Sequence, residues 1–195
     1  MIGEPLAVTL EVIQAFNDLR IPYLLGGSLA SAIYGVLRAT LDSDLVADPD
    51  PDQAAALVQT LSSSFYVTLT SVAQAIEQRT HFSVIHLESI FKVDVFVSQR
   101  RAFDRMRFQR RRLHVVATDP DRALYVSSAE DTILAKLEWY RMGGEVSERQ
   151  WRDVLGMLKV QGRLLERAHL AEWAQALGVA DLLETAFLEA EIGFA

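Results

Sequence analysis

The feature that most constrains the fold is a change of hydrophobic periodicity partway along the chain. Before about residue 118, short apolar runs that suit strands alternate with helical patterns, and from Ser128 onward every pattern is helical. The first part predicts strands at 21–25, 41–47, 65–69, 81–87, 90–97 and 113–117, and helices at 5–19, 28–36, 51–61 and 71–79. The second part predicts four further helices. The chain is therefore expected to be α+β, with a sheet and flanking helices in domain 1–118 and a helical bundle in domain 119–195.

The composition is that of an ordinary globular protein. Of 195 residues, 50% are hydrophobic and 23% are charged, which excludes a disordered chain, a collagen-like fibre and a coiled-coil rod. There is no cysteine, so a disulfide framework, a thiolate metal site and a cysteine nucleophile are excluded. No apolar run approaches the roughly 20 residues of a membrane span, and the first residues lack the basic segment of a signal peptide. We expect a soluble cytoplasmic protein.

The net charge of −7 hides a strongly basic segment. Residues 99–118 contain seven arginines and one aspartate, whereas the segments on either side are acidic. We call these arginines the arginine island: Arg100, Arg101, Arg105, Arg107, Arg110, Arg111 and Arg112. Arginine suits phosphate and stacks on bases, so one interpretation is contact with an RNA or nucleotide. The alternative is that the island pairs with acidic residues of the same protein.

A glycine-rich turn joins the predicted strand 21–25 to the helix that follows. Gly26 and Gly27 allow a ligand to approach the backbone closely, and Ser28 can cap the helix. Such a turn alone is more often only a tight connection.

Two carboxylates interrupt the apolar strand 41–47. Asp42 and Asp44 alternate with Ser43, so they point to one face, about 7 Å apart along the strand. Aspartates repel each other and are poor strand formers, and their oxygens suit Mg²⁺. The alternative is a solvent-facing edge strand with no function for its carboxylates.

A third aspartate, Asp94, lies inside the strand 90–97. If that strand lies beside the strand of Asp42 and Asp44, Asp94 completes a site for two metal ions. Alternatively, Asp94 is only a partner of Lys92 in a salt bridge.

Together these residues resemble the DNA polymerase β-type nucleotidyltransferase superfamily, whose signature is a G-[GS] turn, a D-x-D strand and a third Asp. The chain is more closely similar to small bacterial nucleotidyltransferases that include the abortive-infection AbiEii-type toxins. In these, an R-x-T/S-x-D-x-D strand precedes a helical half with a Lys and an Asp, matched here by stretches 130–137 and 150–154. The likeness covers about residues 21–155.

The resemblance implies a nucleotidyltransferase-type mixed sheet and the transfer of NMP from an NTP to an acceptor hydroxyl. It implies that Asp42, Asp44 and Asp94 are the catalytic metal ligands for two Mg²⁺ ions, with Mn²⁺ as a substitute. The nucleotide-binding residues that it implies are Gly26, Gly27, Ser28, Arg38, Thr40, Lys136 and Asp153. For Lys136 and Asp153 the alternative is an ordinary solvated helix surface. Ser43 departs from the family, which usually has a large apolar residue there; because Ser43 faces away from the carboxylates, this bears on packing.

The sequence leaves the identity of the acceptor undecided. The arginine island favours a polyanion such as RNA or tRNA, and a protein hydroxyl is a further candidate. The family likeness also implies a toxin–antitoxin or phage-defence role with a cognate antitoxin as partner. The rival interpretations are a catalytically silent member that binds a nucleotide or a partner, and an antibiotic-modifying enzyme with a small-molecule acceptor.

Overall fold

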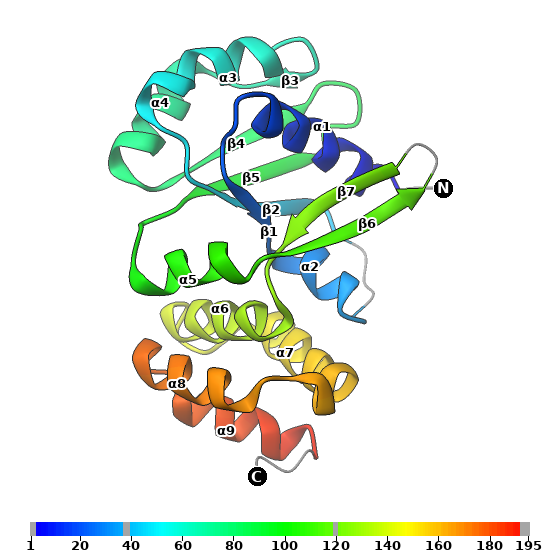
Figure 1. Cartoon of the computed structure of the whole chain (residues 1–195), viewed down its shortest axis with the longest axis vertical. Coiled ribbons are helices and arrows are strands. Elements are labelled where there is room, and N and C mark those ends of the chain that lie inside the picture. Colours follow the sequence, from blue (N-terminus) through cyan, green and yellow to red (C-terminus); the bar gives the residue numbers. More distant parts are fainter. Residues whose placement is uncertain (1–2, 37–39, 119–120, 192–195) are drawn as a thin grey trace. The chain divides into compact units, whose positions relative to one another are not determined.

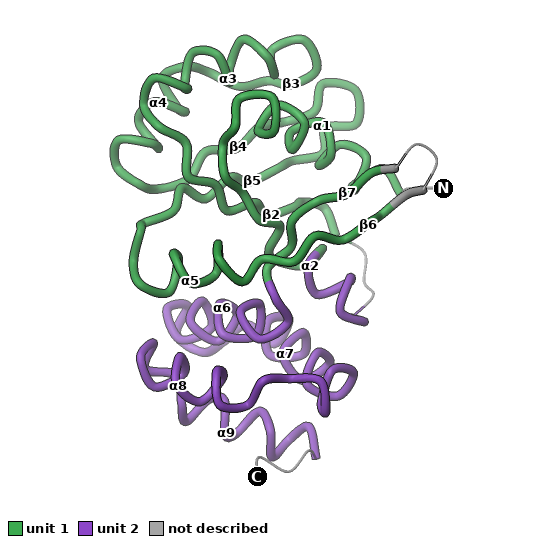
Figure 2. Tube along the Cα trace, viewed as in Figure 1, with its two compact units in different colours: residues 1–29, 39–127 green, residues 30–38, 128–195 purple. Residues whose placement is uncertain are grey.

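The computed structural model describes residues 3–36, 40–118 and 121–191. The chain forms two compact units (Figure 2). Unit 1 comprises residues 1–29 and 39–127 and contains the sheet, and unit 2 comprises residues 30–38 and 128–195 and contains the C-terminal helices. The α+β class predicted from the sequence is confirmed. The predicted domains 1–118 and 119–195 remain a proposal about which parts fold independently.

In the described part of unit 1, seven strands form one sheet in the order β3-β4-β5-β2-β1-β7-β6 (Figure 1). The strands are β1 (Tyr23–Leu25), β2 (Asp42–Ala47), β3 (Phe65–Tyr66), β4 (His81–His86), β5 (Lys92–Val97), β6 (Arg112–Thr118) and β7 (Asp121–Val126). The pairs β2/β5 and β1/β7 are parallel and the other neighbours are antiparallel. The sheet is therefore mixed, as the resemblance implied.

Unit 1 contains helices that follow from apolar side chains at helical spacing and one, at 102–110, that is largely charged. They are α1 (Glu4–Asp18), α3 (Ala54–Leu61), which follows the short helix η1 (Pro51–Gln53), α4 (Leu69–Gln78) and α5 (Ala102–Arg110). Helices α1 and α3 pack together, and α4 packs on both α3 and β4, so these three gather along one side of the sheet (Figure 1). Phe16, Leu24, Leu45 and Leu57 are fully buried there, and the burial of such side chains is the main source of stability in a core of this kind.

The hairpin β6/β7 corrects the sequence prediction. A single strand was expected at 113–117, whereas β6 runs from Arg112 to Thr118 and pairs antiparallel with β7. Strand β7 was not predicted because Asp121 and Arg122 begin it, and only its second half, Leu124 to Val126, has an apolar β pattern.

Unit 2 is helical, as predicted. Its elements are α6 (Ala129–Met142), α7 (Glu148–Gln161), η2 (Gly162–Leu164), α8 (Arg167–Leu177) and α9 (Ala180–Glu189). Serines cap its first two helices: Ser128 Oγ accepts from the backbone N–H of Asp131 at 3.1 Å, and Ser147 Oγ accepts from that of Gln150 at 3.4 Å.

The helix α2 (Gly27–Ile33) begins in unit 1 and continues into unit 2. The segment after it packs on α7, because Gln161 Nε2 donates to the carbonyl of Tyr34 at 3.0 Å. A Cβ on Gly156 would meet Val36 at 2.9 Å, so only glycine lets this segment approach α7 so closely.

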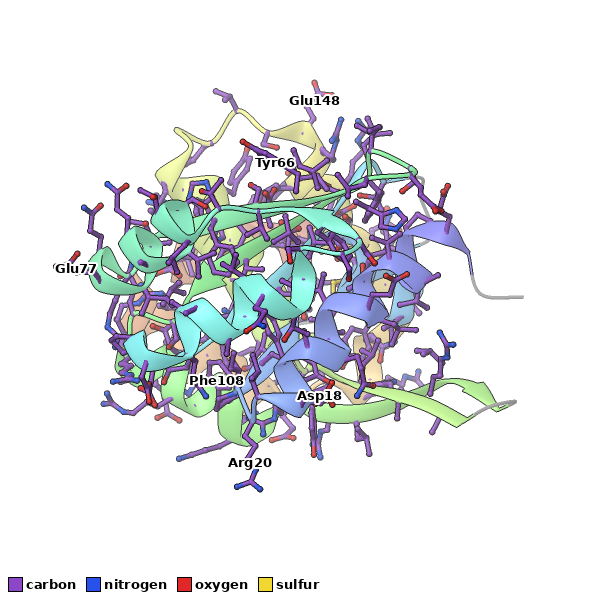
Figure 3. All side chains as sticks on the ribbon, turned by 90° about the horizontal axis from the view of Figure 1, so that it is seen from above. Asp18, Arg20, Tyr66, Glu77, Phe108 and Glu148 are labelled. Carbon is purple, nitrogen blue, oxygen red and sulfur yellow. The ribbon has the colours of Figure 1, made fainter. Side chains whose placement is uncertain are left out.

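Some charged side chains of unit 1 project into solvent. Viewed from above in Figure 3, Arg20 and Glu77 project outward beyond α1 and from the last turn of α4, and both are exposed. Within the residues that the structure describes, the helices are too short or too polar to cross a membrane.

Candidate active site

The three aspartates of the predicted site lie on two neighbouring strands. In the parallel pair β2/β5, Asp44 is in register with Asp94, and Asp42 is in register with Lys92. Strands paired in this way are about 4.8 Å apart, so Asp44 and Asp94 are direct cross-strand neighbours. The adjacency on which the sequence hypothesis depended is present.

These carboxylates lie on the face of the sheet opposite α1. Ser43, between Asp42 and Asp44, is fully buried, and its Oγ accepts a hydrogen bond from Thr9 Oγ1 of α1 at 2.8 Å. Because successive side chains of a strand point to opposite faces, Asp42 and Asp44 face away from α1. The unusual serine is thus part of the packing against α1, as the sequence indicated.

Asp94 is held by two side chains. Ser83, which is in register with it on the antiparallel strand β4, donates its hydroxyl to Asp94 Oδ1 at 2.5 Å. Lys92, two residues earlier on the same face of β5, places Nζ 2.7 Å from Asp94 Oδ2. The hydrogen bond with Asp94 raises the pKa of Lys92, and the charges of Asp94, Asp42 and Asp44 add to this effect. Lys92 therefore lies in the electrostatic field of all three carboxylates.

The glycine turn lies against Asp44. The backbone N–H of Gly26 donates to the carbonyl of Asp44 at 2.9 Å. Gly27 has φ +57°, and a Cβ built on it would stand 1.7 Å from Oδ2 and 2.8 Å from Cβ of Asp44. The absence of a side chain at Gly27 is what makes room for the Asp44 carboxylate.

A chain of hydroxyls connects the turn to Asp42. Ser28 Oγ and Thr40 Oγ1 are 2.9 Å apart. Thr40 Oγ1 in turn lies 2.8 Å from the carbonyl of Asp42 and 3.1 Å from its Oδ1. The structure thus brings Ser28, Thr40 and Asp42 together. The predicted nucleotide-binding residue Arg38 lies outside the described residues.

The donor set fits a hard divalent cation in its chemistry, since it consists of aspartate oxygens on one face of the sheet. Among the described residues, however, three acidic or histidine side chains do not converge closely enough to form a ready cluster of metal ligands. The cation that contacts Asp94 here is the ammonium of Lys92.

Lys136 and Asp153, the predicted helical-half residues, form an ion pair inside unit 2. Lys136 Nζ donates to Asp153 Oδ2 at 2.8 Å, and the two side chains are 9% and 3% exposed. This excludes the alternative of a solvated helix surface, because both groups are buried between α6 and α7. The carboxylate of Asp153 thus holds the ammonium of Lys136 in place.

Part of the arginine island pairs with acidic residues of its own unit. Arg100 Nε lies 3.0 Å from both carboxylate oxygens of Asp48, and its Nη2 reaches Asp50 at 3.3 Å. Arg101 forms an ion pair with Asp104 at 3.3 Å. These contacts match the alternative in which the island pairs with the protein's own acids.

The remaining arginines differ in exposure. Arg107 is buried beside Gly26, its Nη2 lying 3.9 Å from where a Cβ on that glycine would stand. Arg111 stacks over the ring of Tyr125, 4.5 Å from its centroid. Arg105 and Arg112 are exposed, although Arg105 also donates to the carbonyl of Arg100. Arg110 is half-buried in the last turn of α5.

Sequence reasoning missed one residue of the site and placed another only as an alternative. Ser83 carried no local signal, because its role depends on the register between β4 and β5. Lys92 was considered only as a partner that would remove Asp94 from a functional site, whereas the structure places it among all three carboxylates.

The geometry can be compared with known proteins. No protein-family model matches the chain, and no curated protein matches its sequence. One similar solved structure is an antigenic nucleotidyltransferase-like protein from Paracoccidioides brasiliensis, which is 18% identical with a TM-score of 0.51 over 88% of this chain and 90% of that one. Another is the antibiotic-resistance factor ANT(2'')-Ia, 16% identical with a TM-score of 0.50 over 95% of each chain. At these identities the likeness concerns the fold, and this chain has a nucleotidyltransferase-like fold.

Proposed function

We propose that the protein is a divalent-metal-dependent nucleotidyltransferase that moves an NMP group from an NTP to an acceptor hydroxyl. The observation that carries this proposal is the register of Asp44 and Asp94 on parallel neighbouring strands, with Asp42 on the same face and Gly27 against Asp44. The nucleotidyltransferase-like fold supports the same function.

The residues have separate tasks in this proposal. Asp42, Asp44 and Asp94 would hold Mg²⁺, which when bound neutralises phosphate charge and lowers the pKa of the acceptor hydroxyl. Ser83 keeps the carboxylate of Asp94 in one orientation. Gly27 makes room for the Asp44 carboxylate, and the Ser28–Thr40 pair positions Asp42. The turn at Gly27 would bind the triphosphate, as the sequence resemblance implies. The chain contributes mainly position and charge, as is usual for phosphoryl chemistry.

Calorimetric titration of NTP with Mg²⁺, and again with EDTA, tests the proposal. We expect binding that requires the metal and is lost in Asp44→Asn, together with transfer of label from α-labelled NTP in the wild type only. Equal NTP affinity with and without EDTA would contradict the metal-dependent site. Binding that needs the metal without any transfer of label would favour the silent, nucleotide-binding member of this fold.

The acceptor is proposed at the level of chemistry. The exposed Arg105 and Arg112 support a polyanionic acceptor such as RNA or tRNA, whereas the ion pairs of Arg100 and Arg101 reduce the charge that the island offers. A small-molecule acceptor is the second candidate, and the likeness to an antibiotic-resistance factor favours it. Incubation with α-labelled NTP and either total RNA, a protein extract or a panel of antibiotics separates these acceptors.

A role as the toxin of a toxin–antitoxin or phage-defence pair rests on the sequence resemblance to the AbiEii-type toxins. It requires a cognate antitoxin, which we expect to be encoded next to this gene. Expression of the chain alone and with the neighbouring gene product tests this role: growth arrest by the chain alone and rescue by the neighbour would support it.

A further inference from the structure

Lys92 occupies an unusual position for a lysine. Its Cα is in register with that of Asp42, and its Nζ reaches along β5 to Asp94 Oδ2 at 2.7 Å. Asp94 is itself the cross-strand neighbour of Asp44. One ammonium thus stands among three carboxylates, which leaves an excess of two negative charges on this face of the sheet.

We propose that Lys92 is a tethered counter-cation of the Asp42, Asp44 and Asp94 carboxylates, and that a divalent cation binds there only when the ammonium leaves Asp94. This inference rests on the proposed function, because it assumes that the three carboxylates bind a metal. It makes Lys92 a positioning residue that tunes metal affinity.

The physical argument is competition for one carboxylate. An ammonium 2.7 Å from Oδ2 already uses that oxygen, and a metal ion bound to the same carboxylate would stand only a few ångströms from a like charge. Repulsion between a lysine and a divalent ion at that distance is severe unless one of them moves. The metal therefore gains the carboxylate at the expense of the ion pair.

The side chain that moves is Lys92. Its side chain is 43% exposed, and its flexible four-carbon stem can carry the ammonium into water. Asp94 is only 12% exposed, and Ser83 holds its other oxygen at 2.5 Å. Release of the lysine thus leaves the aspartate already oriented for a metal.

If Lys92 has this role, its removal changes two quantities in opposite directions: the stability of the metal-free protein falls and the affinity for the metal rises. Without Lys92, the three carboxylates repel one another and the metal-free protein loses stability. Removal of Lys92 also removes the competitor for Asp94 and therefore increases affinity for the metal. If Lys92 only supported the fold, its removal would not increase metal affinity. If Lys92 only contacted the phosphates of a nucleotide, its removal would leave nucleotide-free metal binding unchanged.

The test is Mn²⁺ binding to the full-length, nucleotide-free protein, measured by calorimetry and by the spin-resonance signal of free Mn²⁺. We expect Lys92→Met to bind Mn²⁺ about tenfold more tightly than the wild type and to melt at a lower temperature without metal. Lys92→Arg keeps the charge and should remain close to the wild type. Lys159→Met, which removes an exposed lysine of α7, is the matched control and should change neither quantity.

Unchanged or weaker Mn²⁺ binding in Lys92→Met would overturn the inference, and Lys92→Gln repeats the neutral substitution with a polar side chain. Asp44→Asn separates this failure from failure of the proposed function. One outcome would make only the role of Lys92 wrong: the wild type binds Mn²⁺ and Asp44→Asn does not, but both neutral Lys92 variants have the Mn²⁺ affinity of the wild type. If neither the wild type nor Lys92→Met binds Mn²⁺, both proposals are wrong.

Discussion

Gly27 and Asp44 lie so close together that no other residue fits at position 27. A Cβ there would stand 1.7 Å from Oδ2, 2.6 Å from Cγ and 2.8 Å from Cβ of Asp44. Rotation of the aspartate about its terminal bonds does not relieve the contact with Cβ, so the whole side chain would have to shift. The turn and the carboxylate therefore depend on each other.

Gly27→Ala is expected to weaken binding of the NTP–metal complex by at least about tenfold, because Asp44 must move. It should also reduce the free energy of unfolding by about 1–2 kcal/mol through the positive φ alone, and further through the clash. Gly144→Ala is the matched control, since Gly144 has φ +74° and no atom within 4 Å of its added Cβ. Urea denaturation and NTP titration of both variants check this. Equal effects in the two variants would show that the contact with Asp44 is unimportant.

Asp44→Asn is expected to abolish transfer while leaving the metal-free protein as stable as the wild type, or more stable by up to about 1 kcal/mol. The reason is that one of three neighbouring like charges is removed, and an amide keeps the size of the side chain. Thermal unfolding in EDTA measures this, with Glu11→Gln on the exposed side of α1 as the control. A loss of several kcal/mol would instead identify Asp44 as a partner in a structural ion pair.

Lys136→Met is expected to destabilise the protein by about 3–5 kcal/mol, because it leaves Asp153 buried without its lysine. The double variant Lys136→Met/Asp153→Leu should recover most of this loss, since it removes both charges. Chemical denaturation of the two variants gives the comparison, with Lys159→Met as the exposed control. If Lys136 also binds phosphate, as the resemblance implies, the NTP–metal complex will raise the melting temperature of the double variant less than that of the wild type.

The local parts of this fold were predictable from the sequence. Alternation of Asp42 and Asp44 with buried residues defines β2, and the serine caps at 128 and 147 define the starts of α6 and α7. Strand β7 was missed because a charged pair begins it. Helix α5 was not among the predicted helices, because only Phe103, Asp104 and Arg107 of its nine residues are buried and two of these are charged.

The site could be predicted only in part. Its aspartates were found because a carboxylate inside an apolar strand is unusual, but their adjacency came from the family likeness. Register between β2 and β5 depends on contacts between residues far apart in the chain, which no local pattern encodes. For the same reason neither Ser83 nor the position of Lys92 among three carboxylates could be derived beforehand.

The arginine island offers a test of the acceptor, because its members are engaged to different degrees. Arg105 and Arg112 are exposed, whereas Arg100 is held by Asp48 and Asp50. If RNA is the acceptor, the double variant Arg105→Gln/Arg112→Gln should flatten the dependence of log affinity on log salt by about 0.7 for each lost phosphate contact. Arg100→Gln, the control, should change this slope less, because its charge is already offset within the protein.

Fluorescence anisotropy of labelled RNA over a salt titration measures these slopes, and labelling with α-labelled NTP gives the parallel readout of transfer. NTP affinity should stay the same in both variants, since the proposal assigns the triphosphate to the metal and the Gly27 turn. A double variant that binds and labels RNA as well as the wild type would remove the island from the acceptor site. The small-molecule or protein hydroxyl would then be the acceptor to pursue, since neither needs a basic surface for its recognition.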